Sequence, residues 1–173
     1  MILKLHSMRQ RGMIEIQAEK EAADYDLPPD EFKHPLNISV CLQDTGEYIE
    51  ADIKLRSFKQ AVCDRCLKEF MLAVNADLRL LMIPGNRQRW SWQDDVLLFS
   101  PDNPEVDISP HLRDAMMLAA PMKILCKEDC RGLCPGCGAD LNYESCACPP
   151  AARDERWQAL SDLRDKLLRN SDE

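Results

Sequence analysis

The sequence predicts an α+β protein, in which an antiparallel β-meander is followed by a helix and a cysteine-rich segment. Apolar residues alternate with polar ones through residues 36–82, and a side-chain period of two is typical of half-buried strands. Residues 126–148 are instead rich in Cys and Gly and have no apolar period. We therefore divide the chain into a β-rich region, residues 1–104, and a second region, residues 105–173, which we expect to pack as one compact unit.

Composition and charge restrict the classes of protein to consider. Hydrophobic residues make up 45% and charged residues 30% of the 173 residues, which argues against a disordered or fibrous chain. The 30 acidic and 22 basic residues give a net charge of -8, whereas a nonspecific nucleic-acid binder normally carries the opposite charge. Any contact with nucleic acid is therefore expected to be local or through a partner protein.

The sequence does not predict a membrane span or an export signal. The longest uncharged apolar run, residues 115–122, is interrupted by Pro121 and is far shorter than the roughly 20 residues of a membrane helix. The first nine residues become polar before a signal-peptide core could form. We therefore expect a soluble cytoplasmic protein without a membrane partner, in a compartment that keeps thiols reduced.

The alternating region defines the predicted strands. A further strand is expected over residues 12–18, and a helix-prone acidic stretch over residues 19–25 ends before Pro28-Pro29. Asp44-Thr45-Gly46 predicts a hairpin loop. The alternating apolar residues are Leu36, Ile38, Val40, Leu42, Ile49, Ala51, Ile53, Leu55, Phe70, Leu72, Val74, Ala76, Leu78 and Leu80.

Two helices are expected after a mobile loop or insertion between Pro84 and Pro104. Ser109-Pro110 predicts the N-cap and first position of a helix that ends before Pro121. Its apolar face, which we expect in the core, consists of Leu112, Ala115, Met116 and Ala119. A last helix is predicted from near Asp154 and is expected to dock on the sheet or on the cysteine-rich segment, through Trp157, Leu160, Leu163 and Leu167.

Eight of the nine cysteines form four closely spaced pairs. An odd count without an export signal makes a disulfide framework the poorer explanation. Four pairs instead supply two tetrahedral sites of four thiolates, which suit zinc because thiolates are soft ligands. We assign one structural zinc to Cys63, Cys66, Cys126 and Cys130 and a second to Cys134, Cys137, Cys146 and Cys148. Other pairings, an iron–sulfur cluster or ordinary buried thiols are the alternatives, and Cys41 is assigned no role.

The first of these sites would join the predicted sheet to the C-terminal region. Closing the 59-residue gap between Cys66 and Cys126 costs about 4 kcal/mol of chain entropy. Structural zinc contributes about 10–16 kcal/mol, so the metal can offset that cost.

Several motifs of this chain are shared with a known family. They are Ala61-Val62-Cys63-Asp64-Arg65-Cys66-Leu67-Lys68-Glu69-Phe70, Val106-Asp107-Ile108, Leu125-Cys126-x3-Cys130-Arg131-Gly132-Leu133-Cys134-Pro135-x-Cys137-Gly138-x2-Leu141-Asn142, Cys146-x-Cys148 and Asp154-x-Arg156-Trp157-x2-Leu160. Over residues 2–168 the chain resembles the bacterial YceD family, whose members are linked to accumulation of large-subunit ribosomal RNA and have a counterpart in plastids. The resemblance implies a role in ribosome biogenesis.

These observations lead us to expect a non-enzymatic zinc-containing factor that supports accumulation or maturation of large-subunit ribosomal RNA by stoichiometric binding. An acidic surface is complementary to basic ribosomal proteins, which favours such a protein over the ribosomal RNA or the pre-ribosome as partner; no small-molecule substrate is expected. Direct RNA contact would use two local patches, for which solvated charge with packed aromatic residues is the preferred alternative. The patches contain Arg9, Arg11, Arg87, Arg89, Trp90 and Trp92.

An enzyme is the alternative class. A thiol–disulfide oxidoreductase would use Cys63 and Cys66, and a zinc-dependent enzyme would need an open coordination position and a nearby general base. The histidines are scattered, with no Glu at metalloprotease spacing. The sequence shows no Gly-rich phosphate loop and no serine nucleophile motif. We therefore assign no catalytic residue.

Overall fold

The computed structural model describes residues 1–7, 12–85, 95–149, 155–160 and 162–164. The chain divides into two compact units, Met1–Asp64 with Lys68–Glu128 and Arg65–Leu67 with Asp129–Glu173. Among the residues described, no helix is long and apolar enough to cross a membrane. The elements are β1 (Ile2–Lys4), η1 (Leu5–Ser7), β2 (Met13–Lys20), η2 (Ala22–Tyr25), β3 (Leu36–Asp44), β4 (Ile49–Val62), β5 (Glu69–Pro84), β6 (Val96–Phe99), β7 (Glu105–Asp107), α2 (Ser109–Leu118) and η4 (Glu155–Trp157).

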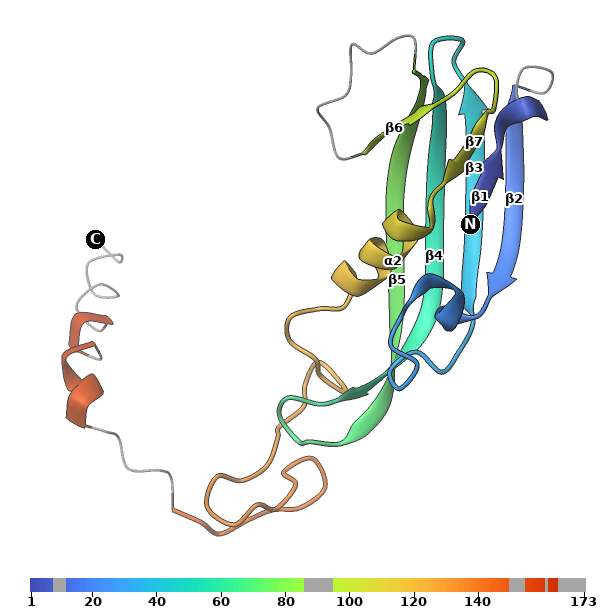
Figure 1. Cartoon of the computed structure of the whole chain (residues 1–173). Coiled ribbons are helices and arrows are strands. Elements are labelled where there is room, and N and C mark those ends of the chain that lie inside the picture. Colours follow the sequence, from blue (N-terminus) through green and yellow to red (C-terminus); the bar gives the residue numbers. More distant parts are fainter. Residues whose placement is uncertain (8–11, 86–94, 150–154, 161, 165–173) are drawn as a thin grey trace. The chain divides into compact units, whose positions relative to one another are not determined.

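The first unit is built on a five-stranded sheet of order β2-β3-β4-β5-β6 (Figure 1). Strands β2 to β5 form the predicted antiparallel meander. The longest pairing joins β4 to β5, from Ile49 opposite Met82 to Val62 opposite Glu69. The α+β class predicted from the sequence is confirmed.

One face of this sheet forms the hydrophobic core. The inward side chains of β3, β4 and β5 pack with Leu112 and Met116 of α2, as predicted, and with Leu3 of β1 and Val106 of β7. Figure 1 shows α2, β1 and β7 on this face of the sheet. Alternate residues of the same strands point to the other face and are mostly exposed. The period of two seen in the sequence therefore reports a sheet that is covered on one face.

Two predicted segments need correction, and one sheet was missed. The loop expected between Pro84 and Pro104 contains β6, which pairs parallel to β5. The helix-prone stretch 19–25 is helical only in η2, because its first two residues, Glu19 and Lys20, complete β2 opposite β3. The two-stranded sheet of β1 and β7 was not predicted.

The predicted final helix begins at Glu155 as the turn η4 and continues as α-helix through residues 158–160 and 162–164. Its apolar residues Trp157, Leu160 and Leu163 are 64%, 56% and 52% exposed. Leu167, the fourth residue of the predicted face, lies outside the described residues. Docking of this face stays a prediction.

The start of α2 differs by one residue from the prediction. Ile108, not Ser109, is the N-cap, and it offers no side-chain acceptor. The Asp107 carboxylate takes over this role, accepting the Ser109 hydroxyl at 2.7 Å and the Ser109 backbone N–H at 2.9 Å. These two hydrogen bonds lower the pKa of Asp107 from 3.8 to about 2.

This cap predicts a measurable titration. Because the folded-state pKa is lowered, the carboxylate stabilises the fold above about pH 4 and loses this effect as the pH falls towards 2. The NMR titration of Asp107 should have its midpoint near pH 2. Asp107→Asn should lower the free energy of unfolding at pH 7 by less than about 1 kcal/mol, because the side chain is largely exposed. Asp102→Asn is the control; a midpoint near 3.8 for Asp107 would contradict the capping role.

Candidate metal centres

The first cysteine pair lies in the turn that joins β4 to β5. Cys63 follows β4 directly, and its backbone N–H donates to the Lys68 carbonyl at 2.9 Å. Leu67 takes a positive φ of 57°, which closes the turn before β5 begins. The strand pairing therefore fixes where Cys63 and Cys66 stand.

Asp64, the first residue between these cysteines, binds the segment that follows α2. Its backbone N–H donates to the Ile124 carbonyl at 2.8 Å, and its carboxylate accepts the Ile124 N–H at 2.6 Å. Ile124 lies two residues before Cys126. This pair of bonds holds the chain that carries Cys126 beside the turn that carries Cys63.

Arg65, the second residue between the cysteines, binds the segment around Cys130. Its guanidinium donates to the Cys130 carbonyl at 2.6 Å, and its own carbonyl accepts the Leu133 N–H at 3.0 Å. Gly132 stands so close that an added Cβ would lie 2.9 Å from the Arg65 carbonyl oxygen. With a φ of +77°, Gly132 lies in the region that favours glycine.

The Sγ atoms of the first group, Cys63, Cys66, Cys126 and Cys130, all lie within 4.8 Å of one another. Three of the four side chains are buried, and Cys126 is half-buried. Four sulfurs bound to one zinc at about 2.3 Å lie about 3.8 Å apart, so this group fits a tetrahedral metal ion. The Asn142 side-chain amide donates to the Cys130 Sγ at 3.4 Å, a contact that steadies a thiolate.

In the second group, the Sγ atoms also lie within 4.8 Å of one another; its members are Cys134, Cys137, Cys146 and Cys148. The chain around Cys134 folds back on itself: its N–H donates to the Ala139 carbonyl at 2.8 Å, and its carbonyl accepts the Gly138 N–H at 2.9 Å. Gly136 leaves room for Cys148, whose Sγ would lie 3.2 Å from a Cβ placed there. Cys137 and Cys146 are exposed, so this group is nearer to solvent than the first.

The thiols of the second group differ in acidity. Backbone N–H groups of Cys137 and Gly136 lower the pKa of Cys134 from 9 to about 6, because they stabilise the thiolate. Hydrogen bonds with the sulfurs of Cys137 and Cys134 raise the pKa of Cys148 to about 11. A thiolate is thus favoured at Cys134 even without a cation.

The two groups have the membership that the sequence analysis preferred. In the part of the chain that the structure describes, no His, Asp or Glu joins either group, and Cys41 lies apart on β3. The expected RNA contacts, Arg9, Arg11, Arg87, Arg89, Trp90 and Trp92, lie outside the described residues. The sequence analysis assigned no role to Arg65, Gly132 and Asn142, although all three belong to the motifs quoted there, because a motif does not show which groups its residues contact.

Fold and site together define a small α+β protein with two groups of four cysteines that could each hold a metal ion. The chain belongs to the YceD family: residues 51–164 match the family described as "Large ribosomal RNA subunit accumulation protein YceD". The match contains all eight grouped cysteines.

Relatives in plants and bacteria are similar to parts of the chain. The "Large ribosomal RNA subunit accumulation protein YCED homolog 1, chloroplastic" of Arabidopsis thaliana is 38% identical over 79 residues, and its Zea mays counterpart is 45% identical over 72. These stretches cover 44% and 41% of this chain but only 25% and 23% of the plant proteins. An uncharacterized protein of Mycobacterium bovis is 27% identical over 138 residues, 69% of this chain and 64% of its own. No solved structure matches the chain.

The close approach of Gly132 to Arg65 predicts a difference between two glycines. Gly138 has nearly the same positive φ, +76°, but open space around a Cβ. Gly138→Ala should therefore cost only the backbone strain, about 1–2 kcal/mol. Gly132→Ala should cost about 1–3 kcal/mol more, because the methyl group meets the Arg65 carbonyl. Denaturant unfolding of both variants measures this, and equal losses would contradict the close approach.

Proposed function

We propose that this chain is a non-enzymatic zinc-containing factor that supports accumulation or maturation of large-subunit ribosomal RNA by stoichiometric binding. The observation that carries the proposal is the family match, since the matched stretch contains every grouped cysteine. The names of the plant relatives point to the same process.

Zinc is the metal that best fits the four sulfur donors of each group, with one ion in each. Each group offers four sulfurs and no oxygen or nitrogen ligand from the described part of the chain, a set typical of structural zinc. Four thiolates complete a tetrahedral shell and leave no position for water or substrate. Bound zinc would supply a cross-link between distant stretches of chain, which is the reason for proposing a binding factor and not an enzyme.

Charge supports a basic ribosomal protein as the main partner. The chain carries a net charge of -8, and eight thiolates with two zinc ions would bring it to about -12. Such a surface attracts basic proteins and repels ribosomal RNA over most of its area. We place the protein in the cytoplasm, where bacterial ribosomes assemble, and propose neither a membrane partner nor a small-molecule substrate.

Elemental analysis of the purified protein tests the metal. We expect about two zinc ions per chain. Cys63→Ser should lower this to about one and destabilise the fold, because three thiolates lose their ion. Cys41→Ser, outside both groups, is the matched control and should keep two. Iron, or metal-free protein that is still folded, would contradict the proposal, as would a Cys63→Ser variant with full metal and stability.

Depletion of the protein in its own cells tests the function. Loss should lower large-subunit ribosomal RNA more than small-subunit RNA, measured as the ratio of the two mature species. Cys41→Ser should restore the ratio and Cys63→Ser should not. Capture of a ribosomal partner should weaken as salt rises, since surface charges are screened. Normal amounts of both RNAs in depleted cells would refute the role in biogenesis.

A further inference from the structure

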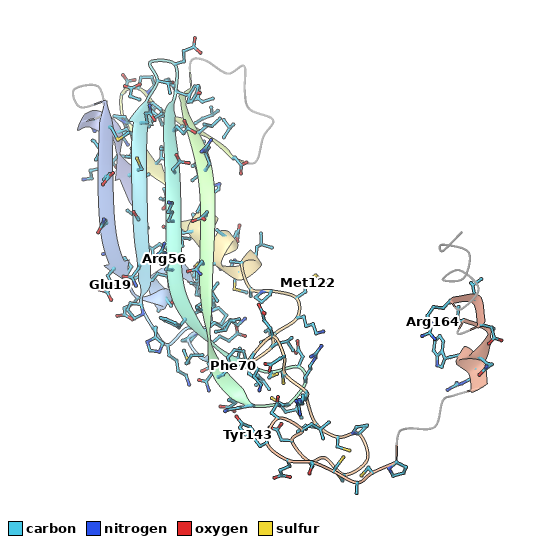
Figure 2. The ribbon with its side chains drawn as sticks, turned by 180° about the vertical axis from the view of Figure 1, so that it is seen from behind. Glu19, Arg56, Phe70, Met122, Tyr143 and Arg164 are labelled. Carbon is cyan, nitrogen blue, oxygen red and sulfur yellow. The ribbon has the colours of Figure 1, made fainter. Side chains whose placement is uncertain are left out.

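The outer face of the main sheet is uncovered in the part of the chain that the structure describes. The core and α2 lie on the opposite face, and Figure 2 shows the outer face with Arg56 among its side chains. The strand register sets the neighbours on this face. Arg56 of β4 stands between Asn37 of β3 and Asn75 of β5, and all three side chains are exposed.

Charge is unevenly distributed along this face. Towards the start of β4, Glu50 and Asp52 bind Arg79 of β5, at 3.0 Å and 2.8 Å, so the charge of Arg79 is neutralised. In the middle of β4, Lys54 and Arg56 make no ion pair with any residue that the structure describes. Asp77 stands opposite Lys54 in the register without pairing with it.

An exposed aromatic ring adjoins these cations. Phe58 follows Arg56 on the same face of β4 and is 49% exposed. The His34 ring meets it edge to face, with centroids 5.8 Å apart and planes at 70°. Lys33, next in the chain, is exposed, and its ammonium donates to the Gln60 side chain and not to a carboxylate.

Unpaired cations beside an aromatic ring and amide side chains are the groups that hold single-stranded RNA. Rings stack on unpaired bases, cations hold phosphates, and amides bond base edges. We propose that the Phe58 face, formed by Lys33, His34, Lys54, Arg56, Phe58 and Asn75, binds single-stranded RNA. This rests on the proposed function and adds to it a direct RNA contact at residues other than the arginines and tryptophans expected from the sequence.

The rest of the molecule restricts this contact to a short strand. On this half of the face, Lys33, Lys54 and Arg56 stand beside the exposed carboxylates of Glu19 and Asp77. The three cations outnumber these two carboxylates, so charge favours an anionic occupant over a basic ribosomal protein, the main partner proposed above. The carboxylates of Glu15, Glu50 and Asp52 on the other half of the face repel phosphates. A duplex buries its bases and cannot stack on Phe58, so unpaired RNA is the form that fits.

Fluorescence anisotropy with a labelled single strand of about 12 nucleotides and the matching RNA duplex tests the proposal on the full-length protein. Phe58→Leu keeps an apolar side chain without the ring and should weaken binding of the single strand about tenfold, whereas Phe58→Trp should retain it. Arg56→Gln should weaken binding and reduce the salt slope by about 0.7. Arg79→Gln removes the same charge from the paired half and should bind within about twofold of the unaltered protein.

The proposal is overturned if the unaltered protein does not bind the single strand, or binds the duplex equally well. It is also overturned if Phe58→Leu and Arg56→Gln bind RNA as tightly as the unaltered protein does. The same holds if these variants keep their RNA binding but no longer bind a ribosomal protein. An experiment in cells separates a failure of the RNA site from a failure of the proposed function. Phe58→Leu that fully restores the ribosomal RNA ratio refutes the RNA site alone, whereas a normal ratio in depleted cells refutes the function.

Discussion

The pairing of β4 with β5 is the constraint on which the rest of the first unit depends. It runs without a break from Ile49 opposite Met82 to Val62 opposite Glu69. Because side chains alternate across a strand, a shift by one residue would expose Leu55 and bury Arg56. The same register ends β4 at Val62 and so places Cys63 at the start of the turn. One pairing thus determines the core, the outer face and the position of the first cysteine pair.

The turn then organises the cysteine-rich part of the chain through its two middle residues. Asp64 binds Ile124, and Arg65 binds Cys130 and Leu133, each through the backbone of its partner. These contacts hold the partner segments through backbone groups, so they do not depend on the side chains of those segments. Metal binding at Cys63, Cys66, Cys126 and Cys130 would therefore add to hydrogen bonds that already hold Cys126 and Cys130, which lowers the entropy that the ion must offset.

The parts of the fold that could be predicted are those with a local signal. The alternation in β3, β4 and β5 and the spacing of the cysteines both lie within short stretches of sequence. β6 is a run of four apolar residues with no alternation, and β1 pairs with β7 across more than 100 residues. Neither leaves a periodic pattern. Phe58 likewise gave no sign of a site in the sequence, because His34, whose ring contacts it, belongs to a different stretch of the chain.

Each cysteine group is proposed to be a closed four-sulfur zinc site that supports the fold and has no open position for chemistry. X-ray absorption at the zinc edge of the purified protein tests this most directly. We expect four sulfur neighbours per zinc at about 2.3 Å and no oxygen or nitrogen neighbour. A shell with an oxygen or nitrogen ligand would reveal an open or mixed site, and would contradict the proposal of a purely structural metal.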